Sequence, residues 1–226
     1  MSAGTPQTVG AIVPTFNRPD LLRSCVLQLG TQSRPPDIVC IHQNGHPDSY
    51  AWAVDDLRLP SRIVYLHSPQ RLRQHDWYAV PLRQLLDAGC THFFWTDHDD
   101  LYLHEHVASG LAQLADCDFV VSRRVGLLFT RPADWRYGAE VDFTSHAPGG
   151  MSASMCFNRA FAQQLLQDLL DDREHQYADN VVAHVTMPRF RCAVSTQRTC
   201  IYHAHEGSLT ARGWLPRVFG PDPAAS

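Results

Sequence analysis

A repeated order of segments in the first half of the chain constrains the fold more than any other feature of the sequence. The apolar run at residues 9–13 is followed by the turn "PTFNRPD" and then by a helical stripe that would end near Gly30. Pro19 suits the first turn of that helix, and the stripe comprises Leu21, Leu22, Cys25, Val26 and Leu29. The runs "DIVCIHQNGH", "SRIVYLHS" and "THFFWT" repeat the strand pattern. This alternation predicts an α/β domain with a mostly parallel central sheet flanked by helices.

The rest of the chain has less regular patterns. Helices are expected over residues 76–88 and 104–115, the first with Trp77, Val80, Leu85 and Leu86 on one face. Asn158 is placed to cap a further helix with Phe161, Leu165, Leu166 and Leu169, and "ADNVVAHV" predicts a short one. Strands are expected at "DFVVS", "VGLLFT", "MSASMCF" and residues 190–195 and 199–203. Residues 131–150 are polar and punctuated by Pro and Gly, which predicts a long loop or short irregular strands.

Length and composition limit the classes of protein to which the chain can belong. A chain of 226 residues and 25.4 kDa fits a single domain, and a hydrophobic fraction of 44% with 19% charged residues is typical of globular proteins. The apolar runs have the length of strands, so no transmembrane segment is expected, and the first residues lack a signal-peptide pattern, so the cytoplasm is the expected location. Seven cysteines without a C-x-x-C pair indicate reduced, buried thiols. A net charge of −4 argues against a nucleic acid partner.

The chain contains no lysine, because all 19 basic residues are arginines. Codon usage in a GC-rich genome is the simplest cause, but the chemical consequence holds whatever the cause. Schiff-base enzymes, P-loop phosphate sites and nucleotidyltransferases that use a lysine are excluded. A diphosphate ligand would therefore be held by arginine, backbone N–H groups or a metal ion.

The "DHDD" turn, residues 97–100, is the strongest candidate for chemistry, and we call it the acidic turn. It directly follows an apolar strand, and the carboxyl ends of parallel strands are where open α/β sheets bind ligands. Asp97, Asp99 and Asp100 would repel one another unless a cation offsets their charge, and carboxylate oxygens suit Mg²⁺ or Mn²⁺. The alternative is a purely structural turn in which Asp99 or Asp100 caps the following helix.

Three motifs in order resemble the family-two glycosyltransferases, which have the GT-A fold and move sugars from nucleoside-diphosphate sugars. "IVPTFNRPDLLRSCVLQL" resembles the opening strand and helix of that family, "FFWTDHDD" is similar to its strand-end D-x-D motif, and "HEGSLT" resembles its late histidine followed by Gly-Ser. The resemblance covers residues 9 to about 210. It implies a single GT-A (Rossmann-like) domain, with a nucleotide-binding half at about 8–122, an acceptor-side half at about 123–210 and a tail at 211–226.

The resemblance also implies roles for individual residues. Pro14, Thr15 and Asn17 would line the nucleoside pocket with Phe16 and Arg18 nearby, and Asn44 would contact the base; the alternative for this turn is a backbone role alone. Asp97 would face the ribose or the metal, and Asp99 would hold Mn²⁺ or Mg²⁺ against the diphosphate. His205 matches the late histidine better than His203 and is the preferred third metal ligand, although either could be an ordinary histidine. Arg212 could close over the diphosphate.

An inverting sugar transfer needs a carboxylate base, and the resemblance points to the segment "EHQYADNVV". Asp179 is the best match there, Glu174 is a weaker rival, and a helix N-cap is the alternative role for Asp179. Trp135, Tyr137 and Trp214 could stack on sugar rings or merely anchor loops. His104 and His106 do not form H-E-x-x-H and are expected to be solvated helix residues.

The sequence therefore predicts a glycosyltransferase, inverting and dependent on a divalent metal. Its partners would be a nucleoside-diphosphate sugar donor and a hydroxyl acceptor, which could be lipid-linked. A peripheral location at the inner face of a membrane is the alternative to a free cytoplasmic one. Two alternatives stay open. One is a catalytically silent protein of the same fold that binds nucleotide sugars or carbohydrates, because Ala178-Asp179-Asn180 departs from the Glu-Asp pair of the family. The other is a nucleotidyltransferase, which the absence of lysine disfavours.

Overall fold

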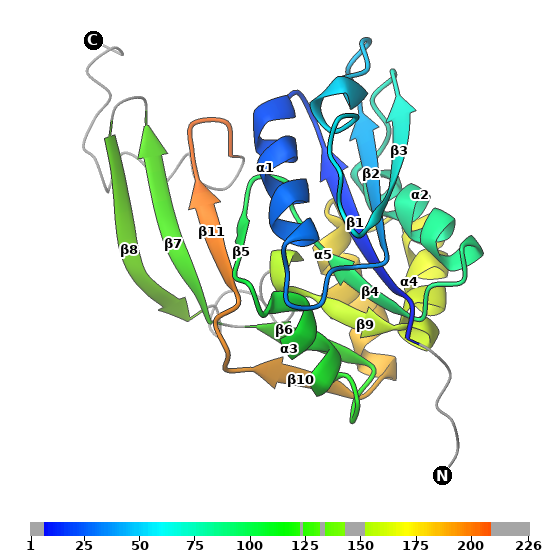
Figure 1. Ribbon diagram of the computed structural model, residues 1–226. Coiled ribbons are helices and arrows are strands. Elements are labelled where there is room, and N and C mark those ends of the chain that lie inside the picture. The colour runs from blue at the N-terminus through cyan, green and yellow to red at the C-terminus, as the bar shows by residue number, and fades with distance from the viewer. Residues whose placement is uncertain (1–6, 123, 132–133, 143–151, 209–226) are drawn as a thin grey trace.

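A seven-stranded sheet forms the centre of the computed structural model, which describes residues 7–122, 124–131, 134–142 and 152–208. The strand order is β10-β6-β9-β4-β1-β2-β3 (Figure 1). The strands are β1 Val9–Thr15, β2 Ile38–Asn44, β3 Arg62–Ser68, β4 His92–Trp95, β6 Phe119–Ser122, β9 Cys156–Asn158 and β10 Cys192–Ser195. Only β9 runs antiparallel to its neighbours, β4 and β6. This large sheet confirms the predicted mostly parallel α/β architecture.

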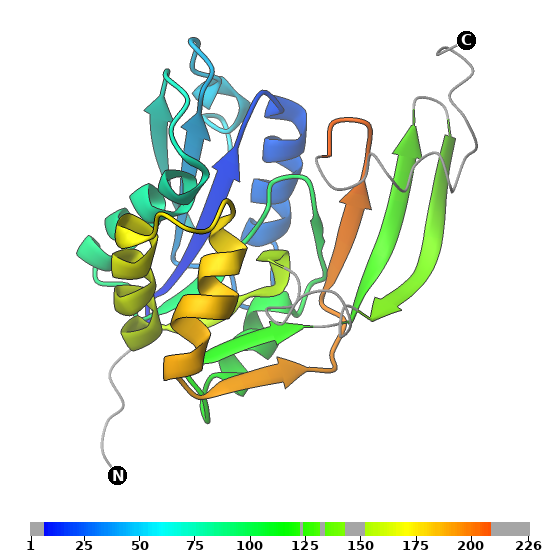
Figure 2. The same ribbon diagram turned by 180° about the vertical axis from the view of Figure 1, so that it is seen from behind.

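Helices cover both faces of the large sheet, so its central strands are buried on both sides. All seven residues of β1 and of β2 are buried, as expected for parallel strands covered on both faces. Helices α1 (Pro19–Gly30) and α3 (His106–Gln113) pack on one face, and α2 (Gln74–Asp87), α4 (Arg159–Asp171) and α5 (Ala178–Val181) pack on the other. Figure 2 shows α4 and α5 from that second side.

The predicted helix signals at two sites are confirmed. Pro19 is the first residue of α1, where its missing N–H leaves no hydrogen bond unmade. Asn158 caps α4, because its side-chain oxygen accepts the N–H of Phe161 at 3.0 Å. In α2 the predicted face was wrong in part: Val80 is exposed, and the buried stripe includes Tyr78, Leu82 and Leu85.

A second, smaller sheet has the order β5-β11-β7-β8, which we call the small sheet. Its strands are β5 Leu101–Tyr102, β7 Arg124–Arg131, β8 Asp134–Asp142 and β11 Cys200–Ala204. The prediction of a loop or short irregular strands after Thr130 was wrong for residues 134–142, which form a long strand paired antiparallel with β7. The missed signal is the alternation of Trp135, Tyr137, Ala139 and Val141, and the rest of that segment, 143–150, lies outside the described residues.

Other expectations needed smaller corrections. "MSASMCF" does not form one strand, because a 3₁₀ turn at Ser152–Ser154 precedes β9. The short helix expected over residues 178–185 is α5 followed by a π-helix at Val182–Thr186. His104 is exposed as predicted, but His106 is buried, with its Nδ1 2.9 Å from the Thr199 hydroxyl. The acidic turn leads into β5 rather than into a helix, since α3 begins only at His106.

The cysteines agree with the predicted reduced, buried thiols at all but one position. All seven cysteines are free, six of them buried, while Cys192 is exposed. Among the described helices, none has the length and apolar character needed to cross a bilayer. The division near residue 122 falls between β6 and β7, but the roles assigned to the two halves stay predictions, and the expected tail at 211–226 lies outside the described residues.

Candidate functional site

Three loops that carry predicted site residues meet at one edge of the large sheet. Strands β1, β2 and β4 are adjacent and parallel, so their carboxyl ends lie together. Pro14 and Thr15 of the "PTFNR" segment end β1 and its last three residues follow the strand, Asn44 ends β2, and the acidic turn follows β4. The topology thus gathers the residues of two separate motifs that are about 80 positions apart.

Asp97 is fixed by two hydroxyl groups that the sequence did not reveal. Tyr78 of α2 donates a hydrogen bond to Oδ1 at 3.2 Å, and Ser152 donates to Oδ2 at 2.9 Å. Burial and the neighbouring Asp99 raise the pKa of Asp97 to about 7, although both hydrogen bonds favour the charged form. Tyr78 and Ser152 lie 19 and 55 residues from Asp97, so no local pattern could have found them.

Asp99 is paired with His205 across the two sheets. The N–H of Gly207 donates to Nδ1 of the His205 ring at 3.1 Å, so the ring proton is on Nε2, which donates to the Asp99 carboxylate at 3.0 Å. Burial is the largest single effect and disfavours the charge on Asp99, but the hydrogen bond from His205 and the neighbouring rings of His98 and His205 together outweigh it and lower the pKa of that carboxyl. The structure therefore brings together two of the three predicted metal ligands.

His203 has a role that the sequence reasoning did not assign: it attaches the small sheet to the acidic turn. Its backbone N–H donates to Asp100 Oδ1 at 2.9 Å, and its ring Nδ1 lies 3.0 Å from the carbonyl oxygen of Asp99. Its Nε2 lies 2.7 Å from the Thr130 hydroxyl on β7. The ring centroids of His203 and His205 are 5.0 Å apart, as expected for alternate residues at the end of one strand.

The charge balance of the acidic turn suits a cation. Asp100 is buried, its Oδ2 has no hydrogen-bond partner within the described structure, and burial with Asp99 and Asp97 raises its pKa well above the ordinary range. Within residues 7–122, 124–131, 134–142 and 152–208, however, no three His, Cys, Asp or Glu side chains gather closely enough to hold a metal ion. The donor set fits Mg²⁺ or Mn²⁺ in the common arrangement of one or two carboxylates completed by substrate phosphates and water.

The turn after β1 contacts the acidic turn directly. His98 Nδ1 lies 3.1 Å from the carbonyl oxygen of Pro14, and the Thr15 hydroxyl lies 2.9 Å from that of Tyr50. Asn17 has a φ of 48°, a left-handed conformation that asparagine tolerates better than most residues. This conformation shapes the tight turn into α1, so the turn residues have a clear backbone role, and nucleoside contact stays a prediction.

Arg18 packs against the late "HEGS" motif. A Cβ atom on Gly207 would lie 1.7 Å from a terminal nitrogen of Arg18, so any other residue at this position would require the guanidinium to move. Arg18 also helps to lower the pKa of His98 through its charge, after the larger effect of burial. The first and the last predicted motifs therefore meet beside the acidic turn.

Asn44 is fully buried at the end of β2. Its Oδ1 accepts the N–H of Leu72 at 2.9 Å, while its Nδ2 has no partner within the described structure. The contact with Leu72 gives Asn44 a structural role, and the predicted contact with a base stays a prediction. Arg212 lies outside the described residues.

Asp179 lies in the first turn of α5, the helix that packs with α2 and α4 on one face of the large sheet. Tyr177, not Asp179, is the N-cap residue, and Asp179 Oδ1 accepts the N–H of Asn180 at 3.0 Å. Its charge helps to raise the pKa of Asp97, after the larger effects of burial and Asp99, and burial raises the pKa of Asp179 itself. The carboxylate is half-buried, within electrostatic reach of the acidic turn.

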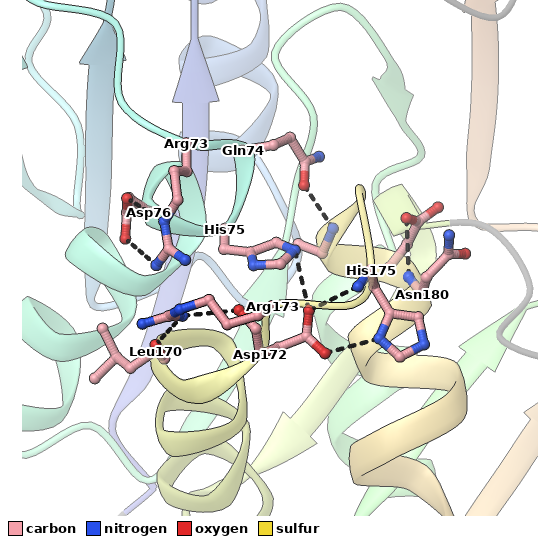
Figure 3. Close-up of polar contacts among 11 residues, drawn as sticks. Arg73, Gln74, His75, Asp76, Leu170, Asp172, Arg173, His175 and Asn180 are labelled. Atoms are coloured by element: carbon pink, nitrogen blue, oxygen red, sulfur yellow. Dashed lines mark hydrogen bonds and ion pairs between the residues drawn. The ribbon is translucent and has the colours of Figure 1, made fainter.

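The segment that leads to Asp179 is tied to the N-terminus of α2. Gln74 accepts the N–H of Ala178, and Asp172 accepts hydrogen bonds from the backbone and the ring of His175 at 2.9 and 2.8 Å (Figure 3). His75 is buried, with its Nε2 3.9 Å from the Asp172 carboxylate. These contacts hold the loop before α5 in place.

The large sheet with its small partner sheet and flanking helices is that of the GT-A fold of glycosyltransferases. The chain is similar in fold to the mannosyltransferase PcManGT from Pyrobaculum calidifontis, which was solved with GDP-Man and Mn²⁺. The match has a TM-score of 0.66 and 17% sequence identity, and it covers 93% of this chain and 60% of PcManGT. It is also similar in fold to residues 1–349 of S. aureus TarS, solved with UDP-GlcNAc. That match has a TM-score of 0.65 and 16% sequence identity, and it covers 89% of this chain and 60% of the TarS structure.

The similarity is one of fold. No family model matches the sequence, and no curated protein matches it significantly. The chain spans 60% of the length of the two structures above and 37% of the longer TarS structure. The predicted resemblance in fold is confirmed, while the site residues stay predictions.

Proposed function

We propose that this protein is a glycosyltransferase that moves one sugar from a nucleoside-diphosphate sugar to a hydroxyl acceptor. The observation that supports it best is the pairing of Asp99 with His205 beside Asp97. This pair lies at the edge of the large sheet where β1, which carries the start of the "PTFNR" segment, also ends. Two proteins of similar fold were solved with nucleotide sugars, UDP-GlcNAc and GDP-Man.

Asp99, with Asp97 and His205, would hold Mn²⁺ or Mg²⁺ at the acidic turn. Such an ion offsets the negative charge that develops on a departing diphosphate. Arg18, the cation that packs against Gly207, would approach the same diphosphate, because the chain has no lysine to do so. Tyr78 and Ser152 would keep the Asp97 carboxylate oriented toward the donor.

Asp179 is the proposed catalytic base. The acceptor oxygen would attack the anomeric carbon on the face opposite the diphosphate, the bond from that carbon to the diphosphate oxygen would break, and Asp179 would accept the hydroxyl proton. Burial raises the pKa of Asp179, which makes its carboxylate a stronger base than an exposed aspartate. This displacement inverts the anomeric configuration.

A catalytically silent binding protein is the second candidate, because Asp179 already accepts the N–H of Asn180 and could serve the turn alone. Release of nucleoside diphosphate from a panel of UDP- and GDP-sugars, with Mn²⁺ and with EDTA, distinguishes the two. A transferase releases the diphosphate only with the metal, and the release stops in Asp179→Asn. Binding of the donor without release supports the silent protein, and pyrophosphate release from a nucleoside triphosphate would indicate a nucleotidyltransferase.

A further inference from the structure

Two large aromatic side chains stand exposed on the edge strand of the small sheet. Trp135 is 68% exposed and Tyr137 is 56% exposed, and both belong to β8, which pairs with β7 alone within the described sheet. Because they are two residues apart on a strand, their side chains share one face. A pair of neighbouring exposed aromatics is a common mark of a binding surface.

The strand register places this pair on the same sheet face as His203. Tyr137 is opposite Leu128 and Trp135 is opposite Thr130, while His203 of β11 is opposite Leu128. We call this surface the aromatic face; its residues are Ile201, His203, Gly126, Leu128, Thr130, Trp135 and Tyr137.

The aromatic face is continuous with the acidic turn. His203 contacts the Asp99 carbonyl at one end of the face and the Thr130 hydroxyl toward β8. Since β8 is two strands away from β11, Trp135 lies roughly 10 Å from the strand that carries His203. A ligand attached to the reacting acceptor group would reach the two aromatics along this face.

Gly126 leaves room for Tyr137 to lie across the strand β7. A Cβ atom on Gly126 would lie 2.7 Å from the Tyr137 hydroxyl and 3.2 Å from the side chain of Ile201. The opposite face of the strand is closed, because Val125, Leu127 and Phe129 are buried. On β7, the aromatic face is therefore the more accessible side, with Leu128 and Thr130 half-buried.

The composition of the aromatic face suits a carbohydrate. Aromatic rings stack on the apolar faces of sugars, and the hydroxyls of Thr130 and Tyr137 offer hydrogen bonds beside them. None of the seven residues of the face is Arg, Asp or Glu. A site for anionic lipid headgroups or nucleic acid would need basic residues there.

From this arrangement we propose that Trp135 and Tyr137 form a subsite that stacks on a sugar ring of the acceptor, which is therefore a glycan. The proposal rests on the proposed function, because it takes the acidic turn as the place of transfer. It adds to that function the chemical class of the acceptor and the part of the chain that holds it.

The test uses the full chain labelled with 5-fluorotryptophan, in which the Trp135 signal is assigned among five tryptophans through Trp135→Phe. The probes are tetrasaccharides of glucose, galactose, mannose or N-acetylglucosamine. Their binding is measured by ¹⁹F NMR. We expect at least one probe to shift the Trp135 signal saturably, and Trp135→Ala with Tyr137→Ala to weaken that binding by about tenfold or more. Trp52→Ala is the matched control, because Trp52 is 66% exposed on a different element, the 3₁₀ turn Ala51–Ala53, and should leave binding unchanged.

UDP and GDP binding with Mn²⁺, measured on the same proteins, separates this proposal from the proposed function. If the nucleotide binds but no probe shifts Trp135, the glycan subsite is wrong while the function stands. If the probes shift Trp135 but no nucleotide binds, the subsite is supported and the transferase is contradicted. A Trp135 signal that moves with phosphatidylglycerol vesicles and not with the sugars would overturn the proposal, as would loss of nucleotide binding in the double variant.

Discussion

The ring of His205 donates a hydrogen bond to the carboxylate of Asp99 at 3.0 Å and so joins residues that are 106 positions apart. His205 follows β11 of the small sheet, and Asp99 follows β4 of the large sheet. The contact places the last predicted motif against the acidic turn.

The first prediction concerns Asp99. Asp99→Asn should lower the rate of transfer by about 10²- to 10³-fold, because it removes the charge that would stabilise a cation and a departing diphosphate. His205→Ala should reduce the affinity for Mn²⁺ about 10- to 100-fold, since it removes the proposed imidazole ligand and leaves Asp99 without its hydrogen-bond donor. Steady-state rates against Mn²⁺ concentration measure both effects. Asp87→Asn, at the exposed C-terminus of α2, is the control and should change neither value.

The second prediction separates Asp179 from its rival Glu174. Asp179→Asn should lower kcat by about 10²- to 10⁴-fold while the donor affinity stays unchanged, because a base acts on the acceptor and not on the donor. Glu174→Gln, at an exposed position, should behave like the wild type. The measurement is kcat together with the Kd of the donor. A loss of donor affinity equal to the loss in rate would show that Asp179 binds the donor instead.

The third prediction concerns the contact between Arg18 and Gly207. Gly207→Ala should displace the guanidinium, since the new Cβ would lie 1.7 Å from it, and should weaken nucleoside-diphosphate binding about tenfold or more. Arg18→Ala should cost a similar amount. The double variant should then bind no more weakly than Arg18→Ala alone, because the clash disappears with the arginine. Additive losses, measured by titration calorimetry, would show that the two residues act independently.

The fourth prediction concerns stability and pH. Burial lowers the pKa of His106 to about 4, so the native state favours the neutral ring while the unfolded chain binds a proton near pH 6.5. Stability contributed by the neutral ring is complete above pH 6.5 and is lost as the pH falls toward 4, by up to about 1.4 kcal/mol per pH unit. The free energy of unfolding of the wild type should therefore fall more steeply between these pH values than that of His106→Asn. Parallel curves would contradict the assignment.

The parts of the fold that follow local rules could be predicted from sequence. The apolar runs before Pro14 and Asn44 indicated buried parallel strands, and Pro19 and Asn158 indicated helix starts, because each signal depends on neighbours a few residues away. The position of the acidic turn at a strand end follows from the same reasoning.

The rest depends on contacts between distant segments. The burial of His106 arises because Thr199 and Phe94 pack against it, and nothing near His106 in the sequence reports either contact. The hydroxyls that orient Asp97 come from Tyr78 and Ser152, which only the tertiary fold brings there. The strand β8 was missed for another reason, since its alternating pattern lay among Pro, Gly and polar residues typical of loops.

A thermal-shift titration with UDP and GDP, with Mn²⁺ and with EDTA, tests the central claim most directly. A ligand that binds only the native state raises the melting temperature as its concentration exceeds the Kd. We predict that at least one of the two nucleotides stabilises the wild type with Mn²⁺, that EDTA removes most of the shift, and that Asp99→Asn abolishes it. If neither nucleotide stabilises the wild type, or if Asp99→Asn is stabilised equally, the acidic turn is not a site for a metal-bound nucleoside diphosphate.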